Sequence, residues 1–262
     1  MILVEARNLK ELWDKLNELL RIEKDLVPNK KGTGYNHRGE YYIHLYDLYF
    51  QIESDRAADL YLEELGYASS GAKITHLLHK YLDPDLVRKW ISFIKKAITE
   101  RPEVFGEIYL ATKVQTKAKG GCIVGFLYRG VPPTLIVYSR SIEMPAKGAA
   151  DVLLVSALSR LIRKTLKLDR LTIKWFTTSL VLPSRRAFIY RVYKWPEEVK
   201  FKNPEFQKYL DDGWNKYYIT DYQFSYSANK RTKALFLKKK DGTLTRTMGA
   251  HQFYLALKEY IQ

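Results

Sequence analysis

Apolar residues recur at helical spacing in several stretches of the chain. In residues 5–24 the leucines fall three or four positions apart, which predicts an amphipathic helix. A stronger apolar repeat predicts a helix over residues 151–164. Further helices are predicted over residues 55–65, over 72–81, over 84–99 with Pro84 in the first turn, and over a short stretch ending at Tyr260.

Runs of aromatic and β-branched residues between these helices predict strands. The longest run covers residues 41–52, and a proline-containing turn at 129–133 joins two shorter runs. The predicted strands are 41–52, 108–115, 122–127, 134–138, 171–177 and 187–193, with a hairpin of 234–237 and 244–247. No internal repeat or long linker interrupts the pattern. We therefore expect one α+β domain over residues 1–262, with a large mixed or antiparallel sheet and flanking helices.

Composition narrows the class of protein. The chain has 262 residues, of which 46% are hydrophobic and 28% charged, so a sizeable core is expected and low-complexity disorder is excluded. No apolar run approaches the roughly 20 residues that span a bilayer. The first residues lack the layout of a signal peptide, so a cytoplasmic protein is expected. A single cysteine, Cys122, excludes an internal disulfide and any multi-cysteine metal site.

The charge balance indicates anionic partners. Lysine and arginine number 44 against 29 acidic residues, which gives a net charge of +15. Nucleotides, nucleic acids and anionic membrane surfaces all fit such a charge. A Lys-rich chain with few Cys and Met is also typical of heat-adapted proteins, so heat adaptation is a second interpretation of part of the lysine content.

Four residues between positions 122 and 151 suggest chemistry. Cys122 opens a predicted strand directly after two glycines, and a reactive thiolate needs partial exposure and nearby positive charge. Arg140 and Ser141 follow a predicted strand end, where a guanidinium and a hydroxyl suit a phosphate. Asp151 begins a predicted helix. Three of them also have a plainer interpretation, namely a small buried residue for Cys122, a surface ion pair for Arg140 and a helix cap for Asp151.

The order of these residues resembles a known family. Cys122, then Tyr138-Ser139-Arg140-Ser141, then Asp151 eleven positions after the arginine, is similar to the core of the thymidylate synthase and deoxycytidylate hydroxymethylase superfamily. The basic segment Lys30-Lys31-Gly32-Thr33-Gly34 is similar to the phosphate loop of that family. The resemblance covers patches of residues 28–182.

The resemblance implies a thymidylate-synthase-like α+β homodimer that acts on a pyrimidine nucleotide. Cys122 would attack C6 of the ring, which makes C5 nucleophilic toward a one-carbon unit from methylenetetrahydrofolate. Either Glu63 or Glu64 would order water and move protons. The remaining implied contacts are Arg140, Ser141, Lys30, Lys31 and a cross-dimer Arg101 for the phosphate, Lys147 for the nucleotide and Glu143 for the folate.

Asp151 bears on the choice of base. The uracil enzymes of the family carry an amide there, whereas a carboxylate accepts from the exocyclic amine of cytosine and repels O4 of uracil. The resemblance is therefore to the cytidylate hydroxymethylases. Ribose against deoxyribose, and a methyl against a hydroxymethyl product, remain open.

Two other classes of function remain as alternatives. In the first alternative the chain is a catalytically degenerate member of this fold that binds nucleic acid. In the second it is an unrelated basic protein that binds nucleic acid. His76 and His79 share a predicted helix face, but the sequence shows no third ligand, so no metal site is expected.

Overall fold

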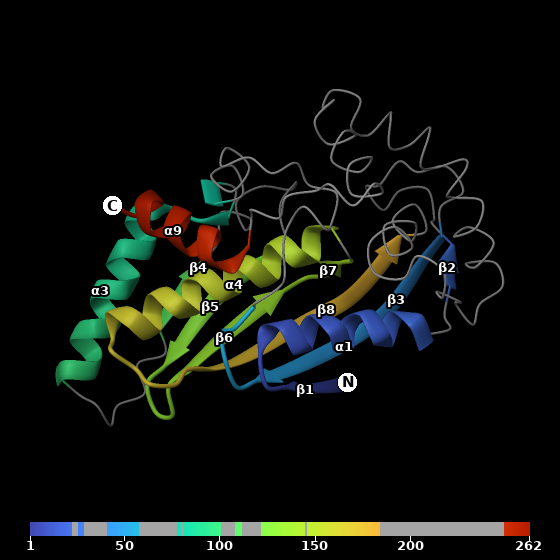
Figure 1. Ribbon diagram of the computed structural model, residues 1–262, viewed down its shortest axis with the longest axis horizontal. Coiled ribbons are helices and arrows are strands. Elements are labelled where there is room, and N and C mark those ends of the chain that lie inside the picture. The colour runs from blue at the N-terminus through green and yellow to red at the C-terminus, as the bar shows by residue number, and fades with distance from the viewer. Residues whose placement is uncertain are drawn as a thin grey trace.

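One mixed sheet with helices packed against it forms the described part of the chain (Figure 1). The computed structural model describes residues 1–22, 26–28, 41–57, 78–79, 81–100, 108–111, 122–144, 146–183 and 249–262. Its strands are β1 (Ile2–Ala6), β2 (Leu26–Pro28), β3 (Tyr41–Ile52), β4 (Ile108–Ala111), β5 (Ile123–Arg129), β6 (Thr134–Ser139), β7 (Ile142–Glu143) and β8 (Thr172–Pro183). Its helices are α1 (Leu9–Ile22), α3 (Pro84–Glu100), α4 (Ala146–Thr165) and α9 (Ala250–Tyr260).

The sheet mixes parallel and antiparallel pairs. Its main path runs β1-β3-β8-β6-β5-β4, with β2 also paired to β3 and β7 also paired to β8. The pairs β1–β3, β6–β8 and β7–β8 are parallel, and the others are antiparallel. The prediction of an α+β fold with a mixed sheet is therefore confirmed.

Helix α4 is the centre of the core. Its residues 148–159 are all buried, so the helix packs on every side rather than along one stripe. It contacts α1, α3 and α9 as well as β7, and Figure 1 shows it crossing the middle strands. On the opposite face of the sheet, Leu3, Tyr46, Tyr138 and Phe176 are exposed.

Regular pairing in the sheet is interrupted along one line. In β3, Asp47 has a positive φ of 54° and is not paired to Thr178, although residues on both sides of it pair with β8. Beside β8, β6 ends at Ser139 and β7 begins at Ile142. In β5 the register shifts between Ile123 and Gly125. The turn that carries Arg140 and Ser141 therefore lies at the same level of the sheet as the start of β5.

Most predicted elements are confirmed within the described residues. The strand over 41–52, the helix over 84–99, the hairpin around 129–133 and the final helix all appear. The predictions over 58–65, 72–77, 112–115, 187–193 and 234–247 lie outside the described residues.

Three predicted boundaries are wrong. The helix placed at residues 5–24 begins only at Leu9, because Ile2–Ala6 form an edge strand. The helix placed at 151–164 begins at Ala146, and the strand placed at 171–177 continues to Pro183. Residues 53–57, the last three of which were assigned to a helix, contain none.

Candidate functional site

Cys122 lies just before β5, in contact with the turn that follows β6. The Ser141 hydroxyl donates to its Sγ at 3.3 Å, and the Arg140 N–H donates to its carbonyl at 2.8 Å. The predicted proximity of the thiol to the Arg140–Ser141 segment is therefore present. The partial exposure that a reactive thiol needs is not present, because Cys122 is only 7% exposed, and this burial fits the plainer interpretation of a small core residue.

Tyr81 links the cysteine to the aspartate. Its hydroxyl donates to Asp151 Oδ1 at 2.7 Å and accepts from the Cys122 N–H at 3.0 Å. Burial raises the pKa of Tyr81 well above its usual range, and the nearby charges of Asp151 and Cys122 raise it further. The hydroxyl therefore keeps its proton and acts as a donor to the carboxylate.

The position of Asp151 excludes the simplest interpretation of that residue. Because α4 begins at Ala146, Asp151 stands in the second turn and not at a capping position. It is 1% exposed. A buried carboxylate is costly unless hydrogen bonds compensate it, and Tyr81 supplies one.

Arg140 lies beside Ser141 in the turn between β6 and β7. It is exposed and lines a pocket of about 410 Å³ on the open face of the sheet, together with Tyr138 and Phe176. Its carbonyl accepts from the hydroxyls of Thr178 and Ser179, which fixes the turn across the interruption in the sheet. The structure thus brings Cys122, Ser141 and Asp151 together, whereas Arg140 lines the pocket on the open face of the sheet, opposite the face that α4 covers.

Of the remaining predicted site residues, two lie within the described part of the chain and five lie outside it. Glu143 is 6% exposed in β7, paired with Val181, and Lys147 lies in the first turn of α4. Lys30, Lys31, Glu63, Glu64 and Arg101 lie outside the described residues, as does His76. His79 Nδ1 lies 3.2 Å from the Tyr260 hydroxyl. Within the described residues, no group of three His, Cys, Asp or Glu side chains is placed to hold a metal ion.

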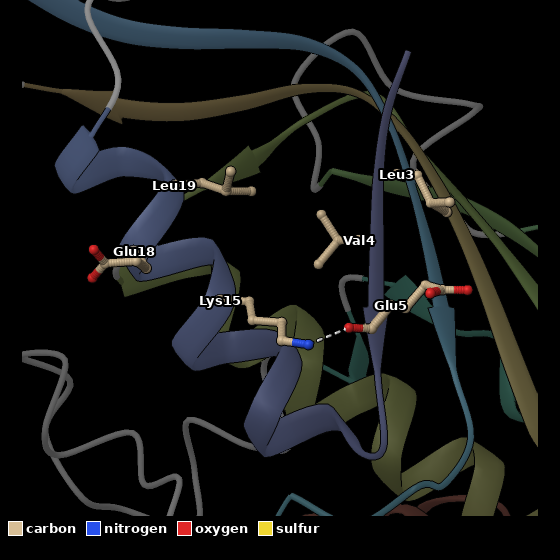
Figure 2. A pocket seen from close by; sticks show the side chains of 6 residues that line it. All are labelled: Leu3, Val4, Glu5, Lys15, Glu18 and Leu19. Atoms are coloured by element: carbon tan, nitrogen blue, oxygen red, sulfur yellow. Dashed lines mark hydrogen bonds between the residues drawn. The ribbon is translucent and has the colours of Figure 1, made fainter.

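A different pocket lies at the edge of the sheet. Its volume is about 430 Å³, and Figure 2 shows it between β1 and α1. Lys15 donates to the Glu5 carbonyl at 2.6 Å, which satisfies one outward carbonyl of this edge strand. The pocket is lined by Leu3, Val4, Glu5, Lys15, Glu18 and Leu19, none of which is a predicted site residue.

Comparison with known proteins places the architecture. No protein-family model matches the sequence, and no curated protein matches it either. Among 86 matching chains of solved structures is thermostable thymidylate synthase A from Bacillus subtilis. That match has a TM-score of 0.51 and 10% sequence identity over 78% of this chain and 91% of that chain. The chain has a thymidylate-synthase-like fold.

This likeness confirms the predicted fold and leaves the chemistry to the site itself. Two structures at 10% identity share an architecture without necessarily sharing an activity. Separately, no described helix has the length and apolar character needed to cross a bilayer. The function is therefore argued below from the side chains around Cys122.

Proposed function

We propose that the protein transfers a one-carbon unit to C5 of a pyrimidine nucleotide, with cytidylate favoured over uridylate. The observation that carries this proposal is the contact chain from Ser141 through Cys122 and Tyr81 to Asp151. It places a nucleophile, two hydroxyl groups and a carboxylate from four separate segments in one cluster, in which Ser141 is half-buried and the other three residues are buried. Such a set suits attack on, and orientation of, a polar heteroaromatic ring.

In the proposed reaction the Cys122 thiolate adds to C6 of the base. A new S–C6 bond forms, and the electron pair of the C5–C6 double bond moves to C5 and the adjoining conjugated system. C5 then attacks a one-carbon electrophile at the oxidation level of formaldehyde. The C5 proton passes to the predicted proton carrier, Glu63 or Glu64, and departure of the sulfur restores the C5–C6 double bond. The Ser141 hydroxyl donates to Sγ and so stabilises the thiolate that begins and ends this sequence.

Asp151 is the proposed reader of the base. Its buried carboxylate, oriented by Tyr81, would accept from the exocyclic amine of cytosine. Facing uracil, the same carboxylate would meet the lone pairs of O4, which repel it in a low-dielectric setting. Cytidylate is favoured for this reason.

The buried thiol imposes a structural condition on the proposal. Cys122 is 7% exposed, so a ring reaches Sγ only if the surrounding segments open. Arg140, exposed in the pocket on the open face of the sheet, is the proposed first contact for the 5′-phosphate, because a guanidinium binds two phosphate oxygens at once. Lys30, Lys31, Arg101 and Lys147 remain predicted contacts to the nucleotide, and Glu63 or Glu64 the predicted proton carrier.

The fit to a folate is poor in the described residues. Methylenetetrahydrofolate, implied by the resemblance, would supply the one-carbon unit when bound. Glu143, the predicted contact to it, is 6% exposed and held in β7 between β8 and α4. The steps above therefore involve this chain, the nucleotide and a one-carbon electrophile, and none of them runs through a folate.

We also propose a homodimer formed through the open face of the sheet. Leu3, Tyr49, Phe176 and Tyr138 stand side by side on four neighbouring strands, and we call them the open-face row. Leu3 is 56% exposed, and Phe176 and Tyr138 are each 37% exposed. A contiguous apolar patch of this kind marks an interaction surface, and a self-complementary face suits a two-fold dimer.

A nucleotide panel tests the substrate class. Ligands that bind only the folded protein raise its melting temperature. We expect CMP or dCMP to stabilise the protein more than UMP, dUMP or inorganic phosphate do, and Cys122→Ala to retain this order. Equal stabilisation by all five compounds would show that only a phosphate is bound and would contradict the proposal.

Nucleic-acid binding is the second candidate, favoured by the net charge of +15. The open-face row is a poor platform for bases, because Phe176 stacks on Tyr49 at 4.6 Å and on Tyr138 at 5.7 Å, which covers its two ring faces. Steeply salt-dependent binding of a polynucleotide that survives Cys122→Ala, with no response to mononucleotides, would favour this candidate instead.

A further inference from the structure

The C-terminal helix is tied to the turn that carries Tyr81. The Tyr260 hydroxyl of α9 donates to the Leu82 carbonyl at 2.9 Å. Its ring packs edge-on against His79, with centroids 4.7 Å apart. At the same end of α9, Arg88 of α3 donates to the Ile261 carbonyl at 2.8 Å. With the 3.2 Å approach of the Tyr260 hydroxyl to His79 Nδ1, four contacts join the last residues of α9 to His79, Leu82 and Arg88.

The helical turn between Leu78 and Leu82 also contributes Tyr81 to the candidate site. The Leu82 N–H closes a helical turn onto the Leu78 carbonyl at 2.8 Å, and both side chains are fully buried. Tyr81 leaves this turn on the inner side and reaches Asp151 and the Cys122 N–H. Tyr260 donates a hydrogen bond to the carbonyl of Leu82, the residue that follows Tyr81.

We propose that Tyr260 is a positioning residue for the site: by anchoring the Leu82 carbonyl, it holds the Tyr81 hydroxyl between Asp151 and Cys122. The relevance of this clamp to catalysis rests on the proposed function, whereas the clamp itself is a property of the fold. Displacements near 1 Å at a reacting group change rates strongly, so one anchoring bond beside Tyr81 has consequences at the thiol.

The single cysteine of the chain allows a direct test without any substrate. The rate at which iodoacetamide alkylates Cys122 in the folded protein reports how the thiol is held. Tyr260→Phe keeps the ring against His79 and removes only the hydroxyl. The variant loses the hydrogen bond to the Leu82 carbonyl together with the contact to His79 Nδ1. We expect the alkylation rate to rise about fivefold, the factor that corresponds to the loss of the ordinary hydrogen bond to Leu82.

A matched control lies on the same helix. Tyr254 packs beneath Arg160, with 4.5 Å from the guanidinium carbon to the ring centroid, and its hydroxyl makes no hydrogen bond among the described residues. Tyr254→Phe should therefore leave the alkylation rate unchanged. Arg88→Gln, which loosens the same end of α9 through Ile261, should raise the rate in the same direction as Tyr260→Phe.

A double variant separates positioning from a general loss of stability. If Tyr260 acts through Tyr81, then Tyr81→Phe combined with Tyr260→Phe should alkylate no faster than Tyr81→Phe alone. The proposal would be overturned if the rate increases of the two single variants multiplied in the double variant, or if Tyr260→Phe left the alkylation rate unchanged. A clamp demonstrated in this way, together with a negative nucleotide panel, would disprove the proposed function alone.

Discussion

At the scale of single residues, Asp151 is the side chain whose identity has the sharpest consequence. Asp151→Asn should shift the preference of the site from cytidylate toward uridylate, because an amide offers both a donor and an acceptor to the O4 and N3–H of uracil. An asparagine oxygen can still accept from Tyr81, so the fold should be retained. The measurement is the order of melting temperatures with CMP and UMP.

The control for this variant is Asp169→Asn, the same chemical change at an exposed position. It should leave the nucleotide order as it is in the parent protein. An unchanged order in Asp151→Asn as well would refute the role of Asp151 as the reader of the base.

The family resemblance, carried by the order and spacing of Cys122, Ser141 and Asp151, was sufficient to propose these residues as neighbours. Tyr81 was missed. It lies 70 positions before Asp151 and carries no local signal, since a tyrosine among leucines at the end of a predicted helix resembles ordinary core. The sequence does not decide between a partly exposed and a buried Cys122, because burial depends on the packing of distant segments.

At the scale of elements, Gly148 sets how closely α4 approaches β7. A Cβ at this position would lie 2.8 Å from Ile142 Cγ2 and 3.3 Å from the Glu143 carbonyl oxygen. Overpacking of this kind costs about 1–3 kcal/mol, and the better helix propensity of alanine returns only about 1 kcal/mol. Gly148→Ala should therefore lower the free energy of unfolding by about 1 kcal/mol in denaturant titrations.

Gly130 provides the matched control, because a Cβ there meets nothing within 4 Å. Gly130→Ala should be neutral or slightly stabilising through the unfolded chain. Equal stability of both alanine variants would contradict the close approach of α4 to β7.

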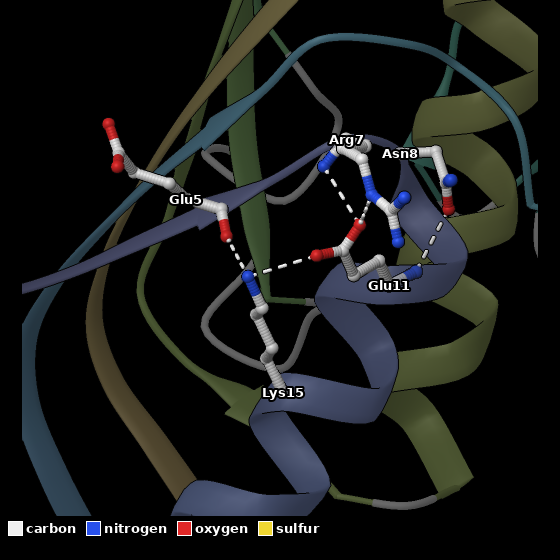
Figure 3. A network of polar contacts seen from close by, with 5 residues as sticks. All are labelled: Glu5, Arg7, Asn8, Glu11 and Lys15. Carbon is white, nitrogen blue, oxygen red and sulfur yellow. Dashed lines mark hydrogen bonds and ion pairs between the residues drawn. The ribbon is translucent and has the colours of Figure 1, made fainter.

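The start of α1 carries a pH-dependent contribution to stability. Asn8 Oδ1 caps the Glu11 N–H, and Arg7 and Lys15 both pair with the Glu11 carboxylate (Figure 3). The hydrogen bonds from Arg7 and Lys15 lower the pKa of Glu11 from its usual 4.5 to about 2. A carboxylate with a lowered folded-state pKa stabilises the protein above its unfolded pKa and loses this effect as the pH falls toward 2.

Glu11→Gln should accordingly melt at a lower temperature than the parent protein at neutral pH. The difference should shrink between about pH 4.5 and 2, and high salt should also reduce it because the pairs are exposed. Melting curves across this range check the expectation. A difference that stays constant with pH would rule out the ion pairs as its source.

Elements with a strong local pattern were predicted well, and those defined by long-range pairing were not. Strand β3 and helix α3 follow from their own periodicity. Strand β1 exists because Ile2–Ala6 pair in parallel with residues 48–52 of β3, and no local signal reveals that partner. The extension of β8 to Pro183 likewise depends on its pairing with the first half of β3.

At the scale of the whole molecule, the open-face row is expected to be covered by a second copy. Phe176→Glu places a charge in the middle of the row and should convert a dimer into a monomer in sedimentation experiments. Phe93→Glu is the matched control, since Phe93 is 57% exposed on α3, away from the row. A parent protein that sediments as a monomer would disprove the proposed dimer.

The class of the fold could be predicted from the sequence, whereas the order of its strands could not. The mixture of helices and strands indicated an α+β domain, and the structural match confirms that architecture. The order β1-β3-β8-β6-β5-β4 depends on contacts between residues far apart in the chain. The interruption of the sheet that places Cys122 beside Ser141 belongs to this long-range level.

Exchange of the C5 hydrogen of CMP with solvent deuterium tests the central chemistry most directly. Reversible addition of a thiolate to C6 makes C5 accept a deuteron, and elimination then returns CMP with the label at C5. The measurement is the loss of the C5 proton signal by NMR in the presence of the protein. We predict exchange with the parent protein and none with Cys122→Ala; exchange at the same rate with both, or with neither, would contradict the account.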